Sequence, residues 1–225
     1  MLPMVDTGSA TFQLYATLPA QISAQIGRAI VEGEFKPGQK LREVDLAQSF
    51  GVSRASVREA LRMVESEGLV TILPQRGAQV TALSVEELRD VFDIRASLMG
   101  LVCQRLAASA TPDIRQRLGE LLKDLRVARD DSDAYGRASL AMTEYCVRHA
   151  GSKRLADLIM SFNRQTARYL RLSLSTPERR RRSYANWNDL VAALVDGKGA
   201  EAERLSRQLG MGTRDTALKM LTAKA

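Results

Sequence analysis

The sequence predicts a mostly α protein in two parts. Residues 1–83 form an N-terminal winged helix-turn-helix, with residues 1–13 as a flexible tail, and residues 84–225 form a C-terminal antiparallel all-α helical bundle. Three observations support this fold. Residues 18–67 show the apolar periodicity of three helices with a tight turn between the last two. Two short strand-like runs follow, and after Leu83 only long helical periods with short breaks remain.

The first predicted helix covers residues 18–35. Ile22, Ile26 and Ile30 recur every four residues and therefore lie on one apolar face. The Lys-Pro-Gly-Gln segment at residues 36–39 ends this helix, because Pro-Gly is a strong turn signal.

A short second helix is predicted over residues 43–50. It closes at Gly51, a residue that suits the tight turn after a helix end. Ser53 then caps a third helix that continues to about Glu67 and stops at Gly68.

A β-hairpin and six long helices complete the prediction. Residues 69–73 and 78–81 are strand-like runs, and the Pro-Gln-Arg-Gly between them is a turn of hairpin length. Short breaks between long helices favour antiparallel neighbours. The helices of the second part are expected near residues 85–109, 112–129, 131–149, 152–174, 178–196 and 199–221.

The net charge of +7 does not by itself locate a surface that binds nucleic acid. The first 83 residues carry 8 Lys/Arg and 8 Asp/Glu, so the whole excess lies in residues 84–225. Any DNA-binding surface in the first part must therefore depend on the local placement of its arginines.

The cysteines and the apolar runs indicate a cytoplasmic protein. Cys103 and Cys146 lie in predicted helices without Cys-x-x-Cys spacing, which favours buried thiols in a reducing compartment over a disulfide. No apolar run approaches the roughly 20 residues that cross a bilayer. The first residues also lack the basic start and long apolar stretch of a secretory signal.

Arginines follow one face of the third predicted helix. Arg54, Arg58 and Arg62 are four residues apart, opposite an apolar stripe that includes Val57 and Leu61. Guanidinium groups pair with guanine edges in the major groove or with phosphate oxygens. The alternative is a solvated helix with scattered charges; the preceding turn and the following hairpin favour DNA. The candidate DNA-binding residues are Arg42, Ser53, Arg54, Ser56, Arg58, Arg62, Arg76 and Gly77.

The segment LREVDLAQSFGVSRASVREALRMVESEGLV, followed by PQRGAQV, resembles the DNA-binding domain of GntR-family bacterial transcription regulators. The resemblance covers residues 18–82. It implies that operator contacts come from Ser53, Arg54, Arg58, Arg76 and Gly77. Many members have Pro at the position of Ser56, a difference expected to be mild. Many also have Arg at the position of Val44, so the resemblance implies the loss of a frequent DNA contact and a different operator preference here.

The second part resembles the FCD ligand-sensing domain of the FadR-type branch over residues 84–222. The matching segments are Val91–Leu98, His149–Leu155 and Ala193–Leu205. Many such domains bind a divalent metal through one Asp and three His. This chain has one His in all, so a three-His site cannot form. The family's metal positions fall at Ser139, Thr143, Trp187 or Asn188, and near Leu209, and no metal cofactor is expected.

The same alignment suggests how a small molecule binds. Arg95 either meets a carboxylate or forms an interhelical ion pair. The candidate ligand residues are Arg95, Ser139, Thr143, Trp187 and Asn188, each with ordinary helix packing as the alternative. His149 is expected at a helix end. The arginines at 179–182 are expected on a solvated face, with DNA backbone or an acidic partner as the alternative.

These expectations combine into a dimeric transcription regulator, a repressor that binds a near-palindromic operator and responds to a small carboxylate or related metabolite. A DNA-binding protein whose bundle only dimerises is the first alternative. A small-molecule enzyme is the second, but the chain has no Gly-x-Ser-x-Gly elbow, Gly-rich phosphate loop or His-Glu-x-x-His motif. The expected partners are therefore double-stranded DNA, a small-molecule effector and a second copy of the chain, with no membrane.

Overall fold

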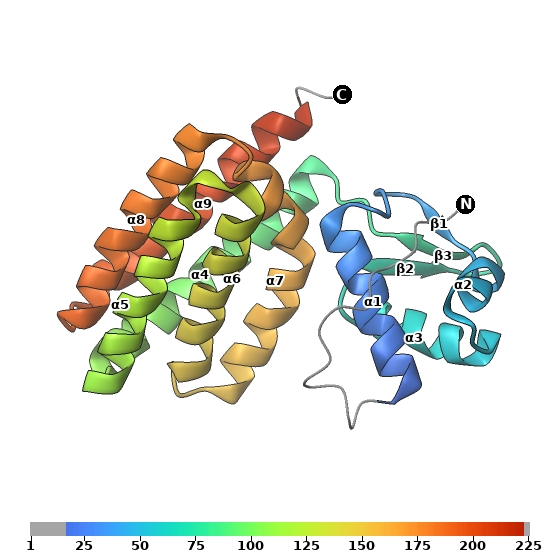
Figure 1. Ribbon diagram of the computed structural model, residues 1–225, viewed down its shortest axis with the longest axis horizontal. Helices are drawn as coiled ribbons and strands as arrows, with labels where there is room; N and C mark the ends of the chain where they lie inside the picture. Colours follow the sequence, from blue (N-terminus) through green and yellow to red (C-terminus); the bar gives the residue numbers. More distant parts are fainter. Residues whose placement is uncertain (1–16, 223–225) are drawn as a thin grey trace. The chain divides into compact units, whose positions relative to one another are not determined.

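A computed structural model describes residues 17–222 and divides the chain into two compact units between Leu83 and Ser84 (Figure 1). The predicted tail, residues 1–13, lies outside the described residues. The first unit holds three helices and a small antiparallel sheet, and the second is entirely helical. The prediction of a mostly α fold with a winged helix-turn-helix and a helical bundle is thereby confirmed.

Three short strands form the sheet of the first unit. Strand β1 (Lys40–Leu41) pairs with β3 (Gly77–Val80), which pairs in turn with β2 (Val70–Leu73), so β3 is central. The hairpin of β2 and β3 was predicted from the sequence. In the observed register, Ala78 lies opposite Ile72. Strand β1 was not predicted, because two residues are too few to show a period of two.

The three helices of the first unit are α1 (Leu18–Glu32), α2 (Glu43–Phe50) and α3 (Arg54–Ser66). The extension of α1 to residue 35 is wrong. Gly33 adopts φ 86°, and its neighbour Glu34 donates its N–H to the carbonyl of Ala29, which closes the helix. Phe35, freed from the helix, is buried in the core.

One apolar core joins the helices of this unit to its sheet. Ile26 and Ile30 of α1 and Val57 and Val64 of α3 are each at most 1% exposed and belong to the same cluster. Burial of such side chains contributes roughly 1.5–3 kcal/mol each. This packing fixes which face of α3 remains at the surface.

The second unit consists of long helices joined by short connections. Every helix boundary lies within two residues of the sequence prediction. Figure 1 shows α5, α6, α7 and α8 as long, neighbouring helices. The elements are α4 (Val85–Ser109), α5 (Pro112–Val127), the short 3-10 helix η1 (Ala128–Asp130), α6 (Ser132–His149), α7 (Lys153–Ser173), α8 (Pro177–Val195) and α9 (Gly199–Thr222).

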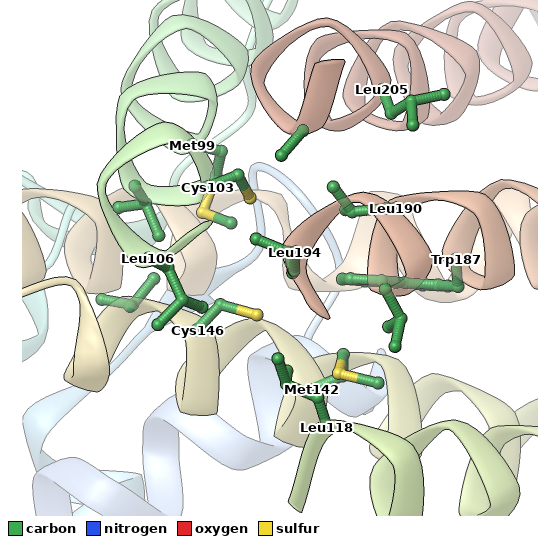
Figure 2. Close-up of a cluster of buried hydrophobic side chains, with 14 of the residues drawn as sticks. Met99, Cys103, Leu106, Leu118, Met142, Cys146, Trp187, Leu190, Leu194 and Leu205 are labelled. Atoms are coloured by element: carbon green, nitrogen blue, oxygen red, sulfur yellow. The ribbon is translucent and has the colours of Figure 1, made fainter. Parts of the chain in front are cut away.

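Side chains from all six α-helices of this unit form the core of the bundle, part of which is shown in Figure 2. Cys103 and Cys146 lie inside it as free, fully buried thiols, as the sequence predicted. Helices α4 and α9 pack closely at Gly210 and Ala96. A Cβ added at Gly210 would lie 3.2 Å from the Ala96 Cβ, so the position has little room for a side chain. Across residues 17–222, the helices are all too short or too polar to cross a bilayer.

Candidate nucleic-acid interface and an internal cavity

Helix α3 presents its arginines to solvent. Arg54, Arg58 and Arg62 are exposed, whereas Val57 and Leu61 on the opposite face are at most 2% exposed. The structure therefore places the arginine stripe on the free face of the helix, where a groove of DNA could receive it.

The start of α3 is built from two serines. The Ser53 side chain accepts the Ser56 N–H at 3.1 Å, and the two hydroxyl oxygens lie 2.9 Å apart. Ser53 therefore caps the helix as predicted. The remaining N–H groups of this helix end form a weakly positive site for a phosphate oxygen.

Arg58 has a partner that the sequence analysis missed. Its Nε and Nη2 donate to the two carboxylate oxygens of Glu43 on α2, at 2.9 and 2.8 Å. The Arg58 hydrogen bond lowers the pKa of the Glu43 carboxyl, so the pair is charged at neutral pH. The two residues are 15 positions apart on different helices, and no spacing rule links them. The pair fixes the orientation of the guanidinium group and leaves Nη1 unpaired among the described residues.

The other candidate DNA-binding residues lie at the start of α2 and in the wing. Arg42 is exposed and directly precedes α2. Arg76 is exposed at the tip of the β2–β3 hairpin, and its N–H donates to the carbonyl of Leu73 at 3.1 Å. Gly77 adopts φ 79°, which only glycine reaches without strain.

A partly open cavity of about 40 Å³ lies in the second unit. Four of the predicted ligand residues line it: Arg95, Ser139, Thr143 and Trp187. Asn188 does not, and its placement in the pocket is wrong. Successive residues of a helix are turned by about 100°, so Trp187 faces inward while Asn188 is exposed. The other lining residues are Ala96, Met99, Leu170, Ser183, Ser206, Leu209, Gly210 and Thr213.

Arg95 enters the cavity wall from α4. Its Nε donates to the Asn163 side-chain oxygen on α7 at 2.7 Å. Burial lowers the pKa of Arg95 to about 10, which leaves it cationic at neutral pH. No carboxylate within residues 17–222 pairs with it, so the interhelical contact is a hydrogen bond rather than the ion pair weighed as an alternative.

The expectation of a solvated arginine run is wrong for two of its four members. Arg179 and Arg180 are 7% and 4% exposed, whereas Arg181 and Arg182 are exposed. Arg180 donates to four backbone carbonyls at the ends of η1 and α7, at 2.7 to 3.3 Å. Arg179 donates to the hydroxyls of two threonines on α9, Thr213 and Thr216. Successive residues of a helix are turned by about 100°, so a run of four arginines cannot lie entirely on the solvent-exposed face.

His149 lies at the end of α6, as the sequence predicted. It is exposed, and its Nδ1 lies 2.8 Å from the Tyr145 carbonyl oxygen. The ring is 4.0 Å from that of Tyr145, centroid to centroid. The histidine therefore completes a helix end and does not reach the cavity.

The residues around the cavity do not fit a divalent metal. Ser139, Thr143, Trp187 and Leu209 occupy the wall and offer two neutral hydroxyls, one of which is already engaged, because Thr143 donates to the Ser139 carbonyl at 2.9 Å. Divalent cations in proteins are held mainly by carboxylate, imidazole or thiolate ligands. In the part of the chain that the structure describes, no three such side chains gather.

Residues 18–80 match the family model of bacterial regulatory proteins of the gntR family, and residues 90–210 match the FCD domain model. The chain belongs to the GntR family. Its second unit is an FCD domain, and the resemblance found in the sequence is confirmed.

Curated relatives of this GntR chain are named as transcription regulators. The transcriptional repressor RspR of Escherichia coli is 35% identical over 118 residues, which cover 52% of either chain. The gluconate operon transcriptional repressor of Bacillus licheniformis is 29% identical over 119 residues, 53% of this chain and 49% of the other. The regulator YdhC of Bacillus subtilis is 29% identical over 147 residues, 64% of this chain and 65% of the other. The matched regions span about half to two thirds of these relatives.

Solved structures share the GntR–FCD fold. E. coli McbR/YncC superposes with a TM-score of 0.79 at 20% identity, over 92% of this chain and 99% of the other. A regulator from Rhodococcus sp. RHA1 gives a TM-score of 0.73 at 22% identity, over 89% and 97%. At these identities the similarity shows the fold alone.

Proposed function

We propose that this GntR chain is a transcriptional repressor that binds a near-palindromic DNA operator as a dimer and is controlled by a small molecule in the FCD domain. The observation that carries the proposal is the free face of α3, where Arg54, Arg58 and Arg62 are exposed opposite a fully packed apolar face. Repressor names among the relatives support the direction of control.

Recognition of the operator begins at the start of α3. Arg54 and Arg58 lie in its first two turns, where a recognition helix in the major groove meets base edges. The Ser53 hydroxyl and the helix N-terminus bind phosphate, and Arg76 in the wing holds the adjacent backbone. A dimer places two such helices on inverted half-sites, which is why the operator is near-palindromic.

Control by a small molecule requires unequal affinity for two states of the protein. A ligand in the cavity changes DNA binding only if it prefers the DNA-competent or the DNA-incompetent arrangement. Such coupling is typically about 1–3 kcal/mol, or roughly 5- to 150-fold in affinity. The cavity supports this role because its polar and aromatic lining suits a small ligand.

A reporter assay tests the proposal. DNA upstream of the chain's own gene is fused to a reporter, and the chain is supplied from a second plasmid. We expect wild type to lower expression and the Arg54→Ala and Arg58→Ala variants to restore most of it, because each loses about 1–3 kcal/mol of operator affinity.

Arg28→Ala is the matched control, because Arg28 is an exposed arginine of the same unit that lies on α1. It should repress like wild type at equal protein level by immunoblot. Equal reporter expression with wild type and with the Arg54→Ala and Arg58→Ala variants would sink the proposal.

A further inference from the structure

We propose that the FCD cavity binds a small carboxylate on the Arg95 guanidinium, and that the buried Arg179 beside it supplies a second positive charge, so that the site works without a divalent metal. This inference rests on the proposed function, because it takes the cavity to be the effector site. It goes further by assigning the residue that stands in for the metal.

Arg179 lies directly behind the cavity wall. Its Nη2 donates at 3.2 Å to the hydroxyl of Thr213, which lines the cavity, and its Nε donates to Thr216 at 3.3 Å. Its Nη1 is buried and has no hydrogen-bond acceptor. Threonine hydroxyls are neutral, so the charge of the guanidinium group is not compensated by its partners.

Two further polar groups near the cavity, both hydroxyls, are poorly paired with one another. The Tyr135 hydroxyl and the Ser139 Oγ are both buried without a hydrogen bond of normal geometry. Ser139 lines the cavity, and the hydroxyls of Ser139 and Ser183 are those next to Tyr135. Burial raises the pKa of Tyr135 to about 12, so it remains a neutral hydrogen-bond donor. Buried donors without a well-formed hydrogen bond cost about 1–3 kcal/mol each, so these hydroxyls gain from an added acceptor.

Arg95 supplies the direct contact. Asn163 is 4% exposed and holds the Arg95 Nε, while the two terminal nitrogens make no hydrogen bond to any residue between 17 and 222. A guanidinium group held in this way offers a fork of N–H donors that matches a carboxylate.

The charges around the cavity are all of one sign. No acidic side chain among residues 17–222 pairs with Arg95 or Arg179, and every lining residue other than Arg95 is neutral. A buried guanidinium group and a partly buried one without a counter-ion are costly, and a bound anion removes much of that cost. This argument favours an anion over the neutral ligand that the hydroxyls alone would accept.

The FCD family implies a metal that helps to hold the ligand, and the wall of this cavity cannot bind one. Ser139, Thr143, Trp187 and Leu209 occupy the wall. Arg179 provides fixed positive charge beside the same cavity, which a carboxylate requires whether the charge comes from a metal or from a guanidinium group. The volume of about 40 Å³ holds roughly three waters, so the ligand has few non-hydrogen atoms unless the cavity widens.

The test is ligand binding by the full chain in EDTA, without DNA, measured by calorimetry and thermal shift. The probes are acetate, its neutral analogue acetamide, and inorganic phosphate. We expect acetate to bind and to raise the melting temperature, and acetamide and phosphate to do neither. Arg179→Gln should weaken acetate binding about tenfold or more, and Arg179→Lys, which keeps the charge, should recover most of it.

Two exposed arginines serve as controls with the same charge change. Arg181→Gln lies two positions after Arg179 on α8, and Arg89→Gln lies on α4 as does Arg95. Both should bind acetate like wild type. Arg95→Gln should lose acetate binding, and it still tests the site if Arg179→Gln fails to fold.

Three results would overturn the inference: acetate binding unchanged in Arg95→Gln and Arg179→Gln, acetate binding that needs added Zn²⁺ or Mn²⁺, or a preference for acetamide or phosphate. Because no DNA is present, these outcomes are independent of whether the chain recognises an operator.

Discussion

At the scale of single residues, the Glu43–Arg58 pair is the feature that most affects how α3 can bind DNA. The carboxylate of Glu43 also lies near Arg54 and Arg62, and all three arginines help to lower its pKa. Glu43 therefore reduces the positive potential of the arginine face and holds Arg58 in one orientation. A recognition residue that is held in place loses less side-chain entropy on binding and distinguishes bases more sharply.

Replacing Glu43 by Gln should reduce the preference for operator over random DNA. We expect stronger binding to random DNA, because the positive charge rises by one, and little gain on the operator, because Arg58 is no longer oriented. Fluorescence anisotropy with both DNAs at equal salt measures the ratio of the two dissociation constants.

Asp45→Asn separates orientation from charge, since Asp45 is an exposed acid of the same helix and makes the same charge change. If the ratio falls equally in both variants, the pairing with Arg58 has no role in specificity.

Sequence reasoning located single residues only as far as local rules extend. Helical spacing placed Arg54, Arg58 and Arg62 on the exposed face, because the apolar stripe opposite them must be buried. It could not assign Trp187 rather than Asn188 to the cavity, since the alignment was uncertain by one residue. Contacts such as Arg179 with Thr213, 34 positions apart, follow from tertiary packing and leave no local signal.

At the scale of elements, helix ends were predictable where the chain carries a cap. Ser84 and Glu87 form a capping box at the start of α4, and Thr111 with Pro112 starts α5. The end of α1 was misplaced because Gly33 precedes the stronger Pro-Gly signal. Strand β1 exists only through its pairing with β3, which no local pattern records.

Arg180 shows how a buried cation can stabilise helix ends. Its guanidinium group joins carbonyls of η1 to carbonyls at the end of α7, and removing it leaves them buried without donors. We expect Arg180→Gln to lower the free energy of unfolding by about 2–4 kcal/mol. Urea denaturation monitored by circular dichroism measures the change.

Arg181→Gln is the control, because Arg181 is the next residue of α8 and is exposed. It should change the free energy of unfolding by less than about 0.5 kcal/mol. Equal losses in the two variants would show that the carbonyl contacts of Arg180 do not stabilise the bundle.

At the scale of the whole molecule, the excess of positive charge belongs to residues 84–225 and not to the proposed DNA-binding unit. Residues 1–83 have no net charge, so a few well-placed arginines must provide the contacts with DNA. Each phosphate neutralised by a cation adds about 0.9 to the slope of log affinity against log salt. The salt dependence of binding therefore counts the phosphate contacts of the intact protein.

Arg76→Ala should weaken binding to all sequences about equally and reduce this slope by about 1, because a wing arginine contacts the backbone rather than base edges. Anisotropy titrations over a range of salt concentrations measure both quantities. An unchanged slope with altered sequence preference would instead place Arg76 at a base edge.

Selection of bound duplexes from a random pool by the full chain shows directly whether α3 recognises DNA sequence in a dimer. We expect enrichment of a near-palindromic motif with two inverted half-sites, and loss of that motif when Arg54 and Arg58 are both replaced by alanine. Recovery of bound DNA with no enriched sequence, or of the same motif with the doubly substituted variant, would contradict it.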